Sequence, residues 1–229
     1  ISPAEAVKNN VFGTKNLLTS ASEHGVERLV QLSTDKAVNP TSVMGCTKRI
    51  CEMLIQTFAG NTDMKCVAVR FGNVLGSHGS VIPLFEAQIK KGGPVTLTDA
   101  NIERYFMTIP EAAQLVLQAG ALAESGSIYV LDMGEPVKIM DLAKQLIRFY
   151  GYEPGVNMDI KIVGLRPGEK LYEELMMDEE QDKMRRTVHN KIFVAPPRNI
   201  DLGEFYQQLQ ELAVAAEHND DSVVEQLAK

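Results

Sequence analysis

The sequence predicts an α/β protein whose parallel sheet is covered by helices on both faces. Two short runs, Arg28 to Thr34 (RLVQLST) and Lys65 to Phe71 (KCVAVRF), are rich in apolar residues. A run with helical spacing, Met44 to Ala59, separates them, so this part of the chain reads strand, helix, strand. Strands that are apolar on both faces are typical of parallel sheets buried between helices, and the ligands of such sheets usually bind beyond the carboxyl ends of the strands.

The same alternation extends along the rest of the chain. Apolar spacing before Gly25 predicts an opening helix with no strand ahead of it. Further helices are predicted at 81–91, 110–122, 139–150, 171–177 and 204–216, and further strands at 95–97, 128–131, 160–163 and 191–195. The later strands are shorter and have more loop between them, which indicates a smaller lobe that caps a ligand.

Composition excludes several classes of protein. The chain has 229 residues, a net charge of −7 and a pI of about 5.2, which argues against nonspecific binding of nucleic acid or anionic lipid. No run approaches the ~20 apolar residues of a membrane span, and no signal-peptide pattern is present, so we expect a cytoplasmic segment. The cysteines and histidines lack metal-ligand spacing, so we expect no disulfide and no metal site: Cys46, Cys51, Cys66, His24, His78, His189 and His218.

Four chemically useful side chains follow the first predicted strand: Ser33, Thr34, Asp35 and Lys36. A carboxyl beside an ammonium at a partly desolvated site can donate and accept protons. The alternative is a solvated turn with a weak ion pair, which is the commoner role of charged loop residues. Met44 and Lys48, four residues apart on the following helix, lie on one helix face, and we expect Lys48 to point back to this loop.

The segment STDKAVNPTSVMGCTK resembles the active-site segment of the extended short-chain dehydrogenase/reductase superfamily. Within it, the likeness is to the UDP-N-acetylglucosamine 4,6-dehydratases and related nucleotide-sugar dehydratases of polysaccharide biosynthesis. That superfamily has a Ser or Thr followed by Tyr-x-x-x-Lys, and Thr34 and Lys48 match the first and last positions. Met44 stands where the tyrosine would be, as in the large membrane-anchored branch. The resemblance assigns the catalytic set to Thr34, Asp35, Lys36, Met44 and Lys48.

A thioether cannot carry a proton, so Met44 leaves one catalytic proton without an obvious carrier. Asp35, Lys48 or an ordered water could take that role, and the sequence does not choose among them. The resemblance also implies a Rossmann-like, doubly wound sheet and a bound NAD or NADP. It assigns the cofactor contacts to Asn10 (in NNVFGTKNLL), Ser33, Lys48, Phe71 and Gly72.

Two later segments match the family's sugar-nucleotide site. RFGNVLGSHGSVIPLF is glycine-rich before a helix, which suits backbone contact with a phosphate, although a plain strand-to-helix connection has the same form. GLRPGEKLYEEL pairs an arginine that suits a pyrophosphate with a carboxylate that suits ribose hydroxyls, although it also reads as an ordinary helix start. The resemblance assigns the substrate contacts to Asn73, Val81, Ile82, Arg104, Arg166 and Glu169.

Family members begin with a strand and a glycine-rich turn that this sequence lacks, so we expect the first half of the nucleotide-binding domain to be absent from this chain. The expected division gives residues 1–75, with about 126–135, to the remaining Rossmann domain. It gives 76–125 and 136–229 to the substrate lobe. The expected partners are a UDP-sugar and further copies in a homo-oligomer, with any membrane anchor elsewhere in the parent protein.

The expected reaction is oxidation of the sugar at C4, elimination of water across C5 and C6, and return of the hydride to C6. Lys36 would take the C5 proton, Asp35 would protonate the departing hydroxyl, Thr34 would polarise the C4 oxygen and Lys48 would hold the nicotinamide ribose. A nucleotide-sugar epimerase of the same superfamily is one alternative, and Met44 argues against it. A non-catalytic nucleotide-sugar-binding protein is another, and the retained active-site segment argues against that.

Overall fold

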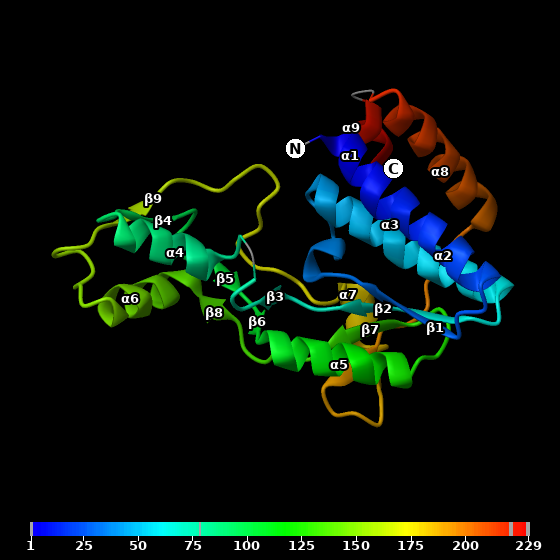
Figure 1. Cartoon of the computed structure of the whole chain (residues 1–229), viewed down its shortest axis with the longest axis horizontal. Helices are drawn as coiled ribbons and strands as arrows, with labels where there is room; N and C mark the ends of the chain where they lie inside the picture. Colours follow the sequence, from blue (N-terminus) through cyan, green and yellow to red (C-terminus); the bar gives the residue numbers. More distant parts are fainter. Residues whose placement is uncertain (1, 78, 220–221, 228–229) are drawn as a thin grey trace. The chain divides into compact units, whose positions relative to one another are not determined.

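The structure is a computed structural model that describes residues 2–77, 79–219 and 222–227, and its contacts divide the chain into two compact units (Figure 1). Unit 1 comprises Ile1–Phe71, Leu115–Asp132 and Glu174–Lys229, and unit 2 comprises Gly72–Gln114 and Met133–Glu173. Each unit has its own hydrophobic core.

Unit 1 is built on one sheet, in the order β1-β2-β7-β11-β10. Strands β1 (Arg28–Leu32), β2 (Lys65–Arg70) and β7 (Ile128–Leu131) run parallel, which confirms the predicted parallel sheet. Strands β11 (Ile192–Val194) and β10 (Arg185–Arg186) extend it antiparallel. Every residue of β2 after Lys65 is buried, as expected of a central strand covered on both sides.

Helices lie on both faces of this sheet (Figure 1). On one face, α3 (Val43–Phe58) packs with α2 (Gly13–Glu23) and α8 (Leu202–Glu217), and Cys66 and Ala68 of β2 join their core. On the other face lies the end of α5 (Ile109–Ala121), where a Cβ on Gly120 would come within 2.9 Å of Val30 Cγ2. Two short helices complete the first layer, α1 (Pro3–Ala6) and α9 (Ser222–Leu227).

The predicted opening helix is present but is not uniform. Between α1 and α2 the residues Val7–Phe12 form a π-helical segment, and Asn10 lies inside it. Extra-residue π segments within α-helices are found disproportionately at functional sites. The sequence pattern does not distinguish this segment from ordinary α-helix.

The C-terminal third packs differently from the expected division, which gave all of 136–229 to the substrate lobe. From Glu174 onward the chain belongs to unit 1, because β11 pairs with β7 and Glu180 of α7 (Asp178–Gln181) forms an ion pair with Arg70 of β2. Apolar residues of α8 also contribute to the unit 1 core: Phe205, Leu209, Leu212, Ala215 and Ala216.

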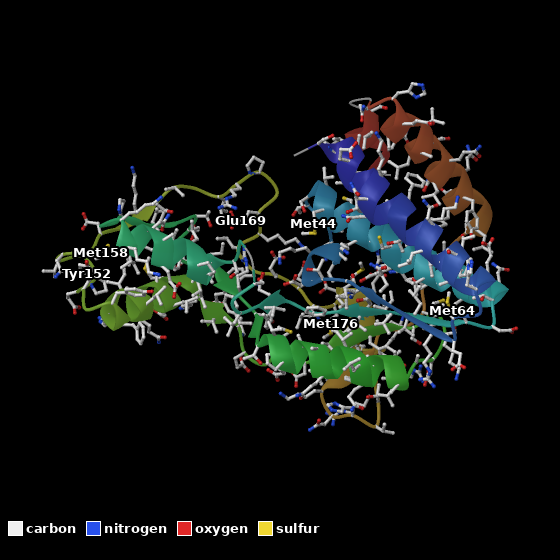
Figure 2. The ribbon with its side chains drawn as sticks, in the orientation of Figure 1. Met44, Met64, Tyr152, Met158, Glu169 and Met176 are labelled. Atoms are coloured by element: carbon white, nitrogen blue, oxygen red, sulfur yellow. The ribbon has the colours of Figure 1, made fainter. Side chains whose placement is uncertain are left out.

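Unit 2 contains three short strand pairs and two helices. Strand β3 (Asn73–Val74) pairs parallel with β6 (Phe106–Met107), β4 (Val95–Leu97) pairs parallel with β9 (Ile160–Ile162), and β5 (Glu103–Arg104) pairs antiparallel with β8 (Val137–Lys138). Its core lies between the strands and the two helices, α4 (Val81–Lys90) and α6 (Ile139–Phe149). Met158 belongs to this core, close to Gly93 (Figure 2).

The predicted helix over 171–177 is wrong. The backbone there forms bends, because carbonyl oxygens that a helix would use internally are engaged by unit 2: Arg104 donates to the carbonyls of Lys170 and Leu171, and the Glu103 amide donates to Leu171. Within the described part of the chain, none of the helices combines the length and apolarity needed to cross a lipid bilayer.

Candidate functional site

The loop after β1 places a buried carboxylate between two donors. Asp35 opens a short 3-10 helix, η2 (Asp35–Ala37), and its side chain is fully buried. Its Oδ1 accepts from Thr34 Oγ1 at 2.7 Å and from Lys36 Nζ at 2.9 Å. Its Oδ2 is buried and has no hydrogen-bond partner among the described residues. A solvated turn is therefore excluded, and one carboxylate oxygen remains for a ligand or a proton.

The loop is fixed to the neighbouring strand through its backbone. The amide of Ser33 donates to the Val69 carbonyl at 2.7 Å, and the amide of Asp35 donates to the Phe71 carbonyl at 3.0 Å. Phe71 and Gly72, both half-buried, thus lie at the same sheet edge as the loop, as the strand assignment predicted. Lys36 is 28% exposed at its side chain, so it borders solvent while Asp35 does not.

The start of α3 presents Lys48 to the end of β1. Lys48 Nζ donates to the Leu32 carbonyl at 3.3 Å, which is the backward orientation that the helix spacing predicted. Met44 lies one turn earlier and is 40% exposed (Figure 2). The Asn10 amide reaches the same turn of α3: it donates to Thr47 Oγ1 at 2.9 Å, and Thr47 donates to the Met44 carbonyl.

A buried ionic network lies directly behind this loop, and sequence reasoning missed it. Glu52 of α3, fully buried, accepts from Ser33 Oγ at 2.7 Å, from Arg70 Nε at 3.0 Å and Nη2 at 2.8 Å, and from Arg49 Nη1 at 3.0 Å. Arg70 also donates to Glu180 at 2.8 Å. The two carboxylates and two guanidiniums balance in charge, and they tie the carboxyl ends of β1 and β2 to α3 and α7.

The opposite charges in this network stabilise one another's charged forms and so offset the cost of burial. Burial alone would raise the pKa of Glu52, but the charge and hydrogen bonds of Arg70, helped by Ser33 and Arg49, hold that pKa below its ordinary value. Burial likewise opposes the charged form of Arg70, yet Glu52 and Glu180 raise its pKa. Arg49 is less well compensated, and burial lowers its pKa. Glu52 and Arg70 are therefore a charged pair, and removal of either leaves the other buried without its counter-charge.

Gly45 is a second residue that the sequence reading passed over, although it lies inside the recognised segment. A Cβ there would lie 2.3 Å from the carbonyl oxygen of Lys36 and 3.1 Å from Pro40 Cβ. Only glycine therefore lets the first turn of α3 approach the backbone of the loop this closely. Its position directly after Met44 was the available signal.

The residues expected to contact the sugar nucleotide all lie in unit 2. Arg104, 9% exposed, pairs with Glu169 at 3.4 Å, and Glu169 also accepts from Thr98 Oγ1 and from the Arg166 amide. The structure thus brings Arg104 and Glu169 together, whereas the Arg166 side chain is exposed. Asn73 donates to the Tyr105 carbonyl at 3.1 Å. Val81 and Ile82 are half-buried in the first turn of α4.

Across residues 2–77, 79–219 and 222–227, no group of three or more His, Cys, Asp or Glu side chains is arranged to hold a metal ion. His78 lies outside these residues. Cys46, Cys51 and Cys66 are free thiols.

A family model described as "Polysaccharide biosynthesis protein" matches residues 1–197. The chain belongs to this family. Over 192 residues it is 58% identical to capsular polysaccharide biosynthesis protein CapD of Staphylococcus aureus, a match that covers 83% of the chain and 32% of CapD. Over 178 residues it is 60% identical to the probable polysaccharide biosynthesis protein EpsC of Bacillus subtilis, covering 78% of the chain and 30% of EpsC. The chain thus spans about a third of the length of these relatives.

A further relative and solved structures confirm the Rossmann-like fold that the resemblance indicated. UDP-glucose 4-epimerase of Rickettsia canadensis is 37% identical, covering 90% of the chain and 55% of that protein. The crystal structure of Pen from Bacillus thuringiensis superposes with a TM-score of 0.78 at 38% identity, covering 85% of the chain and 61% of Pen. The fold also matches dTDP-glucose 4,6-dehydratase of Bacillus anthracis in complex with NAD, with a TM-score of 0.63 at 18% identity, covering 69% and 56%. The chain therefore shares its Rossmann-like fold with these proteins.

Proposed function

We propose that the protein catalyses NAD(P)-dependent 4,6-dehydration of a UDP-N-acetylhexosamine, giving a 4-keto-6-deoxy sugar nucleotide for polysaccharide biosynthesis. The observation that carries this proposal is the buried Asp35 with Lys36 on one carboxylate oxygen and no partner among the described residues on the other. An epimerase removes and returns a hydride at C4 and a proton at the C4 hydroxyl, and it breaks no bond at C6, so it needs no acid and base pair for loss of the C6 hydroxyl.

The pair can supply both the base and the acid of an elimination. Moving one proton across the 2.9 Å hydrogen bond from Lys36 Nζ to Asp35 turns the ion pair into a neutral amine and a carboxylic acid. Lys36 then takes the C5 proton, and Asp35 protonates the departing C6 hydroxyl. Asp35 is fully buried, while the side chain of Lys36 borders solvent, with which it can exchange a proton.

Thr34 and Lys48 have supporting roles. Thr34 donates its proton to Asp35 in the structure, so its hydroxyl must rotate to polarise the C4 oxygen of the sugar. Lys48, already directed at the β1 edge, would hold the nicotinamide ribose. Arg104 and Glu169 would contribute, from unit 2, a cation and a carboxylate for the UDP moiety.

The described residues fit the nicotinamide end of NAD or NADP. The ammonium of Lys48, held at the Leu32 carbonyl at the end of β1, would donate to the hydroxyls of the nicotinamide ribose. When bound, the cofactor supplies reversible hydride acceptance. The NAD complex of dTDP-glucose 4,6-dehydratase, which has the same fold, supports this assignment.

The test is mass spectrometry of UDP-N-acetylglucosamine after incubation with the purified protein and NAD. We expect a product lighter by one water. Asp35→Asn should abolish this product while nucleotide binding persists, and the exposed Asp63→Asn should change neither. An isomer of unchanged mass would identify an epimerase, and bound but unaltered sugar would identify a non-catalytic binding protein.

A further inference from the structure

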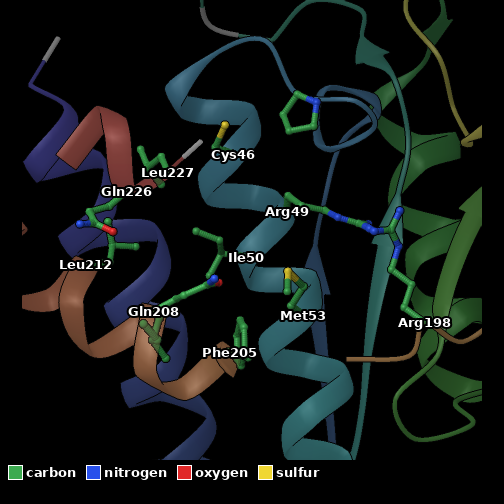
Figure 3. A pocket seen from close by; sticks show the side chains of 12 residues that line it. Cys46, Arg49, Ile50, Met53, Arg198, Phe205, Gln208, Leu212, Gln226 and Leu227 are labelled. Carbon is green, nitrogen blue, oxygen red and sulfur yellow. The ribbon is translucent and has the colours of Figure 1, made fainter. Parts of the chain in front are cut away.

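A pocket of about 340 Å³ lies within unit 1 along α3, with residues of α8 and α9 on one side of that helix and Arg198 on the other (Figure 3). That volume falls in the range of small-molecule sites. No residue assigned to the nucleotide-sugar or cofactor sites lines it. Its lining comes from α3, from α8 and α9, and from Pro40 and Arg198.

The pocket has an apolar body. Ile50 and Met53 of α3 face Phe205 and Leu212 of α8 across it, and Leu227 of α9 closes one end (Figure 3). Phe205 and Leu212 are buried members of the unit 1 core, so this wall is preformed. Such a wall suits a compact hydrocarbon group.

The polar lining includes two arginines. Arg49 and Arg198 line the pocket and extend toward the same side of α3 (Figure 3). Arg49 Nη2 is buried with no hydrogen-bond partner among the described residues. Arg198 Nε lies 4.0 Å from Glu180 Oε1, beyond hydrogen-bond range, and its side chain is 34% exposed. Arg198 Nη2 contacts the Met177 thioether, so the donors that remain on this side are Arg49 Nη2 and the other N–H groups of Arg198.

The surrounding charges do not cancel. The ion pairs around the pocket join three arginines to two glutamates, which leaves 3 − 2 = +1: Arg49, Arg70, Arg198, Glu52 and Glu180. An excess positive charge in a largely buried setting attracts an anion more strongly than the same charge in water. The pocket therefore combines an apolar body with a cationic rim.

We propose that this pocket binds a small amphipathic carboxylate, with its hydrocarbon part between α3 and α8 and its carboxylate at Arg198. Arg198 makes the contact because it is the more exposed of the two arginines, and Arg49 reinforces the positive potential from below. The site is distinct from the proposed catalytic edge but is connected to it, since Arg49 and Ser33 both donate to Glu52.

Calorimetric titration with octanoate, octanol and acetate tests the proposal. We expect octanoate to bind saturably, once per chain, and octanol and acetate to bind at least about tenfold more weakly, because each lacks one of the two interactions. Equal affinity for octanol, or no saturable octanoate binding, would overturn the proposal.

Variants locate the site. Arg198→Gln, at a partly exposed side chain, should lower the affinity for octanoate about tenfold or more and leave the affinity for octanol unchanged. Lys15→Gln, on the exposed face of α2, should change neither affinity. Leu212→Trp should fill the pocket and weaken both ligands. If octanoate binds equally to the parent protein and to Arg198→Gln, the proposed carboxylate contact is wrong.

Cys46 gives an independent readout, because it lines the pocket while Cys51 and Cys66 are fully buried. Burial raises the pKa of the Cys46 thiol, so alkylation by N-ethylmaleimide should be slow but selective. Saturating octanoate should slow labelling of Cys46, measured by peptide mass spectrometry, and octanol at the same concentration should not. Unchanged labelling despite octanoate binding would place the ligand elsewhere.

Discussion

Replacing Glu52 with glutamine removes one charge from a buried network without changing the size of the side chain. Glu52 accepts four hydrogen bonds, from Ser33, from Arg49 and twice from Arg70. In Glu52→Gln the two arginines share only Glu180, so the buried group carries 2 − 1 = +1. Breaking a buried pair on one side costs about 3–5 kcal/mol. We expect a loss of that size in the free energy of unfolding.

Urea unfolding measures this loss in the free energy of unfolding. Hydrogen exchange, followed peptide by peptide, shows which of the two units it affects. Amides of β1 and β2 in unit 1 should lose protection, while those of α6 in unit 2, a separate core, should keep it. The exposed Glu23→Gln is the matched control and should stay within about 0.5 kcal/mol of the parent protein. A loss below about 1 kcal/mol in Glu52→Gln would refute the assignment of Glu52 as the centre of the network.

Three further predictions concern pH, close packing and the loop of unit 2. The pKa of Glu52 is lower in the folded protein than in the unfolded chain, so ionised Glu52 stabilises the fold fully above the ordinary glutamate pKa of about 4.3. This stabilisation is lost as the pH falls through the folded pKa. The difference in free energy of unfolding between the parent protein and Glu52→Gln should therefore narrow in urea titrations from pH 7 to pH 3. Gly45→Ala should lower the free energy of unfolding by about 1–3 kcal/mol and reduce turnover, because the new Cβ would lie 2.3 Å from a carbonyl oxygen. Gly60→Ala, where a Cβ would have nothing within 4 Å, should change neither stability nor turnover. Equal stability of the two variants would contradict the packing argument. Arg104→Gln should speed limited proteolysis within 164–173, because the carbonyls of Lys170 and Leu171 lose their hydrogen-bond donor. Arg148→Gln removes only an exposed ion pair and should leave the digestion rate unchanged. An unchanged digestion pattern in Arg104→Gln would show that other contacts hold the loop.

Elements with a strong local pattern were predictable from the sequence. The strands that became β1 and β2, and the helix α3 between them, were placed to within two residues because each has an apolar run of the right period and length. The loop after β1 was identified from its motif, and the structure adds that Asp35 is buried. The helix expected over 171–177 failed because its carbonyls are used by Arg104, which lies some 65 residues earlier in the chain.

The buried network could not be predicted from the sequence, for a different reason. Glu52 and Arg70 are charged residues within predicted elements, and a helix pattern places such residues on the solvent side by default. Arg70 is buried instead because it pairs with Glu180, which lies 110 residues later in the chain on a four-residue helix. No local periodicity encodes such a contact.

The network also constrains what the β1 edge can recognise. Ser33 donates its only hydroxyl proton to Glu52, so its hydroxyl presents lone pairs to a ligand, and Thr34 does the same until its hydroxyl rotates away from Asp35. The donors at this edge are the ammonium groups of Lys36 and Lys48. A ligand matched to this arrangement must offer donors and acceptors side by side, as the hydroxyls of a sugar and the carboxamide of a nicotinamide do. The charged residues behind the loop thus fix the direction of its hydrogen bonds, and through them the class of molecule that we propose it binds.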